Sequence, residues 1–188
     1  MVLHFKRTAA RGFTLIELLI VVIILAIIAA IAIPQFTNNT DDARVAALDS
    51  NLAAVRAALE QYRIQHTGNV YPGAVAATGA TCTVGAAVTP AAAGSKEAMD
   101  AQLTGYSNAA GQVCTGPTPG YTFGPYLRQG LPADPITGTR TVVVTSAGAP
   151  LAPAAATGGW AYDTMTGQFV VNSNAPETTG SARTLSQH

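Results

Sequence analysis

An acidic residue lies within a long apolar run near the amino terminus. Glu17 is the only charged residue in the 21 residues 13–33. A lone carboxylate is costly in the apolar part of a membrane, and an opposite charge beside it lowers that cost. The best-attested use of such a buried charge is to fix the register between packed helices. We therefore expect this costly carboxylate to serve a purpose.

The two cysteines, Cys82 and Cys114, are candidates for covalent chemistry. Both lie in the part of the chain that the charge pattern places outside the cytoplasm, where an even number of cysteines favours a disulfide. Such a bond would close a loop of 33 residues and stabilise the fold by roughly 3–4 kcal/mol in the chain-entropy model. Two free thiols are the alternative. A two-cysteine metal site is disfavoured because the spacing does not suit zinc.

No group of residues suggests an enzyme. A serine or cysteine nucleophile needs a base beside it. His66 lies in the last turn of a predicted helix, where we expect it to be solvated or to interact with the helix dipole. His188 is expected to be mobile. The sequence has no phosphate-binding glycine loop, metal-binding helix motif or paired-carboxylate site. We predict no catalytic residues, no cofactor and a mechanical function.

The overall composition disfavours two classes of protein, intrinsically disordered proteins and nucleic-acid-binding proteins. Hydrophobic residues make up 48% of the 188 residues and charged residues 11%, with a mean hydropathy of +0.27. A chain this apolar is not intrinsically disordered. Its formal net charge of zero provides no basic field for binding nucleic acid, and no nucleic-acid partner is predicted. The length predicts one domain plus an additional segment.

The apolar run 13–33 is long enough to cross a membrane. As a helix it would measure about 31 Å, which matches the hydrocarbon core of a bilayer. Basic residues precede the run, and the first charges after it are acidic. The positive-inside rule therefore places the amino terminus in the cytoplasm and the residues beyond Pro34 outside it. The flanking charges are Lys6, Arg7 and Arg11 on one side and Asp41 and Asp42 on the other.

Two other interpretations of the run stay open. A secretory signal peptide could be cleaved after Ala30-Ile31-Ala32, although signal peptides have shorter apolar regions. The product would be a secreted soluble binding domain. A plain signal anchor has the right length, but it gives no purpose to the costly Glu17.

The string Gly12-Phe13-Thr14-Leu15-Ile16-Glu17 follows a short basic leader and is followed by Pro34. This arrangement resembles the processing site of the type IV filament superfamily, which includes type IV pilins and the pseudopilins of type II secretion. The resemblance implies that a prepilin peptidase removes the leader 1–12 after Gly12, and that the new amino terminus on Phe13 is N-methylated. Glycine suits such a site because its backbone can be approached closely. The resemblance also implies that Glu17 pairs with the amine of Phe13 in a neighbouring subunit.

The same resemblance implies partners and a location. The subunit would be a single-pass inner-membrane protein, surrounded by lipid before assembly, with a cytoplasmic amino terminus and a carboxyl-terminal domain in the periplasm or outside the cell. Copies would then associate as a homo-oligomeric helical filament, driven by an inner-membrane platform protein and an assembly ATPase. The implied fold is α+β, with a long amino-terminal helix packed on a small carboxyl-terminal antiparallel sheet.

Residues 34–67 are predicted to continue the membrane helix as an amphipathic stalk that ends near Gly68. Apolar residues recur there at intervals of three and four, which predicts one apolar face that packs on the soluble domain. We expect Pro34 to kink the helix rather than end it, because a helical pattern resumes beyond it. The apolar face consists of Val45, Leu48, Leu52, Val55, Leu59 and Tyr62.

The remaining residues, 68–188, are predicted to form an extracytoplasmic coat domain. Glycine, proline, threonine and alanine dominate 69–120, which predicts mostly irregular loop. The expected elements are a short helix over 96–103 and strands over 141–145, 160–162 and 168–172, the last two forming a hairpin. One face of that hairpin should carry Trp160, Tyr162, Phe169 and Val171.

Two strings in the coat domain strengthen the family resemblance. Residues 126–135 (YLRQGLPADP) are similar to a turn that precedes the sheet in many pseudopilins. Residues 159–163 (GWAYD), followed by Thr166-Gly167, resemble a hairpin common among secretion-type pilin-like proteins. Together they favour a pseudopilin of a type II secretion system over a type IV pilin of a surface pilus.

One departure from the family concerns calcium. The major pseudopilin of type II secretion usually binds calcium in an acid-rich carboxyl-terminal loop. Here the only acidic residues after Asp100 are Asp134, Asp163 and Glu177. Calcium takes about six to eight oxygen ligands, so we predict no metal site.

Overall fold

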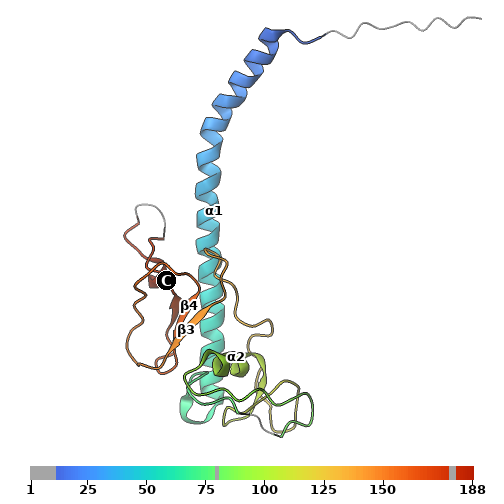
Figure 1. Cartoon of the computed structure of the whole chain (residues 1–188), viewed down its shortest axis with the longest axis vertical. Coiled ribbons are helices and arrows are strands. Elements are labelled where there is room, and N and C mark those ends of the chain that lie inside the picture. Colours follow the sequence, from blue (N-terminus) through green and yellow to red (C-terminus); the bar gives the residue numbers. More distant parts are fainter. Residues whose placement is uncertain (1–11, 79–80, 178–180) are drawn as a thin grey trace, which may run out of the picture. The chain divides into compact units, whose positions relative to one another are not determined.

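The computed structural model of the chain describes residues 12–78, 81–177 and 181–188, with the backbone alone for residues 33–39 (Figure 1). The chain divides into two units, Met1–Asp42 and Ala43–His188. The longest element is α1, a single α-helix over Leu15–Gln65. It continues through Pro34, so the alternative that the helix ends there is wrong. A kink at Pro34 stays a prediction.

The end of α1 follows from the residues after it. His66 already has an extended backbone, and Gly68 adopts a φ of +81° inside the short 3-10 helix η1 (Thr67–Asn69). Left-handed backbone of this kind is common directly after helices and is easiest for glycine. The predicted end of the stalk helix near Gly68 is confirmed.

In the unit Ala43–His188, one face of α1 packs against the sheet and the short helix α2 (Lys96–Thr104). The predicted apolar face is buried from Leu48 to Tyr62, while Val45 is only half-buried. This packing confirms that the face covers the chain's own domain. The core residues, each at most 1% exposed, are Leu48, Leu52, Val55 and Leu59 of α1, Met99 and Leu103 of α2, and Trp160, Tyr162, Phe169 and Val171 of the sheet.

The sheet has three strands in the order β3-β4-β5: β3 (Val142–Thr145), β4 (Trp160–Asp163) and β5 (Phe169–Val171). In the antiparallel hairpin of β4 and β5, Trp160 lies opposite Val171 and Tyr162 opposite Phe169. The hairpin and the shared face of these four residues are as predicted. The strand β3 instead pairs with β4 in parallel. The α+β class is confirmed, but the prediction of a wholly antiparallel sheet is wrong, since the sheet is mixed.

The parallel pairing depends on the connection between β3 and β4. Parallel neighbours need a crossover, which is usually a helix, whereas here residues 146–159 cross over as loop. Side chains hold this loop in place. The Gly148 N–H donates to Asp163 Oδ2 at 3.0 Å, the Leu151 N–H donates to Gln168 Oε1 at 2.7 Å, and Asn174 Nδ2 donates to the Ala154 carbonyl at 2.8 Å. Because the loop has no helical pattern, nothing in its sequence indicates a parallel strand.

Residues 69–120 are mostly irregular, as predicted, with α2 (Lys96–Thr104) and the two-residue antiparallel strands β1 (Tyr106–Ser107) and β2 (Val113–Cys114). The helix α2 begins at Ser95, whose hydroxyl accepts a hydrogen bond from the Ala98 N–H. Gln102 of α2 is fully buried. It accepts from the Gly73 N–H at 2.6 Å and donates to the Gly111 carbonyl at 3.1 Å, so one amide holds two loops together.

The two coat strings singled out in the sequence meet in space. Trp160 Nε1 donates to the Pro132 carbonyl at 2.9 Å. Asp134 is fully buried, and its Oδ2 accepts from the Gly159 N–H at 3.2 Å and from the Thr137 hydroxyl at 2.6 Å. The turn over 126–135 therefore positions the start of β4.

Candidate functional site

The expected processing site precedes α1. Gly12 and Phe13 are exposed, and the Phe13 side chain is 89% accessible. A Cβ placed on Gly12 would meet no atom within 4 Å, so the fold itself does not require glycine there. Any requirement for glycine must come from a molecule that approaches this backbone. The basic residues Lys6, Arg7 and Arg11 lie outside the described residues.

Glu17 closes the first turn of α1 together with Thr14. The Thr14 N–H and hydroxyl both donate to Glu17 Oε2, at 2.9 and 2.8 Å, and the Glu17 N–H donates to Thr14 Oγ1 at 3.3 Å. This reciprocal arrangement is a capping box, which satisfies N–H groups that have no acceptor within the helix. The sequence interpretation missed Thr14, although a threonine three residues before a glutamate is the known pattern for this cap.

The cap uses only one of the two carboxylate oxygens. Both hydrogen bonds that the carboxylate accepts end on Oε2, and among the described residues Oε1 of Glu17 has no hydrogen-bond partner. Glu17 is also exposed. One oxygen therefore supports the helix, and the other remains available to a cation from outside this chain.

The helix beyond the cap is apolar on all sides. Over Leu15–Ala32 the mean hydropathy is 3.3 and none of the window is buried, and it is the one helix among the described residues that is long and apolar enough to cross a membrane. A helix that is apolar all round needs lipid or other helices around it. The composition of the segment therefore suits lipid or packing among other apolar helices.

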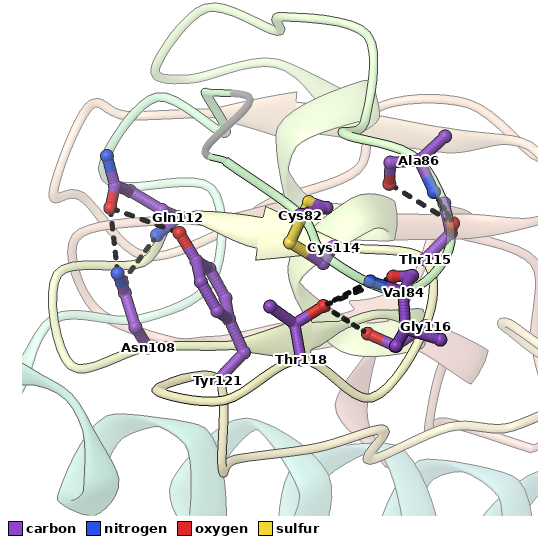
Figure 2. Close-up of a disulfide and its surroundings, with 10 residues drawn as sticks. All are labelled: Cys82, Val84, Ala86, Asn108, Gln112, Cys114, Thr115, Gly116, Thr118 and Tyr121. Carbon is purple, nitrogen blue, oxygen red and sulfur yellow. Dashed lines mark hydrogen bonds between the residues drawn. A yellow bond between two sulfur atoms is a disulfide. The ribbon is translucent and has the colours of Figure 1, made fainter.

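Cys82 and Cys114 form a disulfide with their Cα atoms 5.8 Å apart (Figure 2). The free-thiol and metal-site alternatives are therefore wrong. Two threonines hold the same loop beside β2: the Thr118 hydroxyl donates to the Val84 carbonyl at 3.1 Å, and Thr115 Oγ1 accepts from the Ala86 N–H at 2.8 Å. We call residues 82–88, which the disulfide and these two threonines hold in place, the stapled loop.

His66 is buried, and the expectation that it is solvated is wrong. Its Nδ1 lies 2.7 Å from the Tyr62 carbonyl and its Nε2 lies 3.0 Å from Ser107 Oγ. Burial lowers its pKa, partly opposed by the Tyr62 carbonyl. The contact with Ser107 has the distance of a nucleophile and its base, but Ser107 is fully buried and no substrate could reach it. His66 instead joins the end of α1 to β1.

His188 is also fixed, contrary to the expectation that it is mobile. Its side chain is 1% exposed, and Nδ1 lies 2.6 Å from Asp49 Oδ1 on α1. Arg56 Nη1 donates to the His188 carbonyl at 3.0 Å. These contacts hold the short 3-10 helix η2 (Leu185–Gln187) near α1.

The acidic residues considered for calcium have structural partners instead. Asp163 is fully buried, and its Oδ1 accepts from the N–H groups of Met165 and Thr166 at 2.8 and 2.9 Å. Burial alone would raise the pKa of Asp163, but these hydrogen bonds and the one from the Gly148 N–H outweigh it and lower the pKa. Across the described residues, no group of three or more histidine, cysteine or acidic side chains could hold a metal ion.

Comparison with known proteins finds relatives in pili and in secretion systems. The chain is 49% identical over 59 residues to the type IV narrow pilus major component PilA5 of Thermus thermophilus, covering 31% of this chain and 51% of that protein. It is 39% identical over 61 residues to the type II secretion system core protein G of Pseudomonas aeruginosa, covering 32% and 43%. It is 46% identical over 54 residues to the type IV major fimbrial protein FimA of Dichelobacter nodosus, covering 29% and 35%.

The chain thus spans about half the length, or less, of these curated relatives. No solved structure matches it. The relatives are structural components rather than enzymes. A family model described as the prokaryotic N-terminal methylation motif matches residues 7–33, which include Gly12, Phe13 and Glu17. Over its amino-terminal third, the chain is thus similar to type IV pilins and to type II secretion core proteins.

Proposed function

We propose that this protein is a structural subunit of a type IV filament. One combination of features carries the proposal: a methylation motif over residues 7–33 that continues into an unburied apolar helix containing a single charge. The prepilin peptidase cleaves after Gly12, and Phe13 becomes the N-methylated amino terminus. The apolar half of α1 is then held in lipid, with the coat domain on the extracytoplasmic side, until the subunit joins a filament.

In this proposal Glu17 joins each subunit to the next. Cleavage creates a positively charged amine on Phe13, next to Thr14 of the capping box. The Oε1 atom of Glu17, which the cap leaves without a partner, accepts from the amine of an adjacent subunit. Both charges lie in apolar surroundings, where each is costly alone and much less so when paired. The pair therefore favours one register between neighbouring helices over others.

The pseudopilin of a type II secretion system is the more specific form of the proposal. The matches to core protein G support it, as does the resemblance of the turn over 126–135 and of the β4–β5 hairpin to secretion-type proteins. Deleting the gene should then cause exported proteins to accumulate in the periplasm, while surface fibres persist. An inner-membrane platform protein and an assembly ATPase would drive filament growth.

A surface pilus is the second candidate, and the 49% match to a narrow pilus component favours it. Deletion would in that case remove fibres visible by electron microscopy and leave export unchanged. The same deletion strain therefore separates the two candidates. Loss of neither export nor fibres would contradict both.

The first test is the amino-terminal mass of the protein purified from its native membranes. We expect a chain that begins at N-methylated Phe13. A chain that begins after Ala32 would indicate a secreted soluble protein, and an uncut Met1 would indicate a simple membrane anchor. Either of these results would overturn the proposal.

A further inference from the structure

Thr14 determines where α1 begins. The Leu18 N–H donates to the Thr14 carbonyl at 3.3 Å, which gives Thr14 the position of the N-cap residue. The Glu17 N–H donates to Thr14 Oγ1 at 3.3 Å, and the Thr14 N–H donates to Glu17 Oε2 at 2.9 Å. If the helix began one residue earlier, the Glu17 N–H would donate to the Phe13 carbonyl instead. The side chain of Thr14 thus competes with an extension of the helix toward the amino terminus.

The peptide bond between Gly12 and Phe13 lies just outside this helix start. Neither residue has regular secondary structure, and within the described part of the chain neither carbonyl accepts a backbone hydrogen bond. Both residues are exposed. The carbonyl of Gly12, which a peptidase would attack to cleave this bond, is therefore open.

A second helix start is available two residues upstream. Glycine is about as good an N-cap as threonine, whereas valine and alanine are poor ones. With Gly12 as the N-cap, Phe13 and Thr14 would be helical, and the Gly12 carbonyl would accept from the Ile16 N–H. Apolar surroundings favour such a longer helix, because the chain must satisfy its own backbone groups there. The carbonyl to be attacked would then already be engaged in a hydrogen bond.

The capping box decides between these two starts. For the start at Thr14, the third helical residue is Glu17, whose carboxylate accepts from the Thr14 N–H. For a start at Gly12, the third helical residue would be Leu15, which cannot accept a hydrogen bond through its side chain, and glycine has no side chain to complete a box. Only the start at Thr14 has a complete box, and it leaves the bond after Gly12 non-helical.

We propose that Thr14 is a positioning residue for leader removal, because its cap keeps the Gly12–Phe13 bond outside the helix. The inference rests on the proposed cleavage after Gly12. In that reaction the peptidase adds water across the bond, so that Gly12 ends as a carboxylate and Phe13 as a free amine. Thr14 takes no part in this step. It raises the fraction of precursor in which the bond is accessible, and a substrate whose competent form is less populated binds more weakly by that fraction.

Cleavage kinetics of two Thr14 variants test the proposal. Thr14→Val keeps the branched shape and loses the capping hydroxyl, whereas Thr14→Ser keeps the hydroxyl. Full-length precursor in detergent is incubated with purified prepilin peptidase, and kcat and KM are measured. We expect Thr14→Val to raise KM roughly tenfold without changing kcat, given the typical strength of a cap, and Thr14→Ser to behave as wild type. An unchanged KM in Thr14→Val would overturn the proposal. A fall in kcat alone would also overturn it, because Thr14 would then act in the transition state.

Leu15→Val is the matched control. It introduces the same valine side chain next to Thr14, at a position that has no part in the capping box. We expect its KM to stay within about twofold of wild type, since leucine and valine differ little in helix propensity. Equal increases in KM for Leu15→Val and Thr14→Val would mean that the peptidase rejects valine near the bond, and would overturn the role of the cap.

An NMR signal from the bond itself reports the helix start without the peptidase. The dipeptide Gly-Phe occurs once in the sequence, so precursor labelled with ¹³C-carbonyl glycine and ¹⁵N-phenylalanine gives one signal for the Gly12–Phe13 pair. The carbonyl carbon shifts downfield when it enters a helix. We expect this shift in Thr14→Val and not in wild type or Thr14→Ser. Identical carbonyl shifts in wild type and Thr14→Val would overturn the proposal.

The proposed function and this inference fail separately. Wild-type precursor that the peptidase leaves uncut would overturn the cleavage after Gly12, whatever the NMR signal does. Wild-type precursor that is cut normally, together with an unchanged KM in Thr14→Val, would overturn only the positioning role of Thr14.

Discussion

Two carboxylates show how differently the two units of this chain use charge. Asp163 in the coat is fully buried, and both of its oxygens accept hydrogen bonds from neighbouring N–H groups. Glu17 is exposed, and one of its oxygens has no partner among the described residues. A carboxylate whose two oxygens both accept hydrogen bonds from its own chain can stabilise the fold. A carboxylate with one oxygen unpaired is available to another molecule. In the function proposed here, this difference separates a residue for folding from a residue for assembly.

The comparison predicts that changes near the amino terminus alter processing and assembly but not the coat. Gly12→Val should have the largest effect, because a branched side chain prevents close approach of the peptidase while the fold has room for it. We expect at least about a tenfold loss of the mature form, measured by the amino-terminal mass. The thermal unfolding of the coat should not change. Normal cleavage would show that glycine is not what the peptidase needs.

Glu17→Gln separates the two roles of Glu17. Glutamine at this position still forms a capping box, so the helix start should be kept while the charge is lost. We expect a processed subunit in the membrane with strongly reduced filament yield, counted by electron microscopy. Thr14→Ala is the converse variant, which weakens the cap and keeps the charge. Should Glu17→Gln assemble normally, the ion pair would not be what sets the register.

In the coat, the largest predicted loss comes from the disulfide. Changing Cys82 and Cys114 together to serine should lower the free energy of unfolding by about 3–4 kcal/mol, as the chain-entropy model gives for a loop of this length. Chemical denaturation of the purified protein measures this loss. Processing at Gly12 should be unaffected. A coat of unchanged stability would mean that the threonine contacts alone hold the stapled loop.

Asp163→Asn matches Glu17→Gln chemically but should affect folding alone. Replacing the carboxylate leaves buried N–H groups poorly satisfied, which costs about 1–3 kcal/mol. The lowered pKa of Asp163 also makes this contribution depend on pH. It is fully present above the unfolded pKa of about 3.9 and is lost as the pH falls through the lower folded pKa. Unfolding curves between pH 7 and pH 2 should therefore converge for wild type and variant. Curves that stay parallel would contradict this role.

The features that were predicted correctly depend on residues that are close together in the sequence. The apolar run, the helical spacing from Leu48 to Tyr62 and the apolar face of the β4–β5 hairpin all arise from local periodicity. The capping partner Thr14 is equally local, because it lies three residues before Glu17 in the sequence pattern of a capping box. These features need no knowledge of which distant segments meet.

The features that the sequence did not predict depend on contacts between distant residues. The parallel strand β3 is set by a crossover without a helix, and the burial of His66 depends on Ser107, 41 residues further along the chain. Likewise, His188 is held by Asp49, 139 residues away. A terminal or helix-end histidine looks solvated until the fold supplies its partner. Polar residues in the coat are therefore the least predictable class in this chain.

The capping box of Thr14 and Glu17 also affects the entropy cost of binding a second subunit. A free glutamate side chain samples many rotamers, and ordering it at an interface opposes binding. Thr14 restricts those rotamers before any neighbour arrives and holds Oε1 at a defined distance from the helix start. The carboxylate is thus preorganised, and an incoming amine meets a fixed acceptor rather than a moving one. In the proposed filament, such a subunit would lose less conformational freedom each time a copy is added.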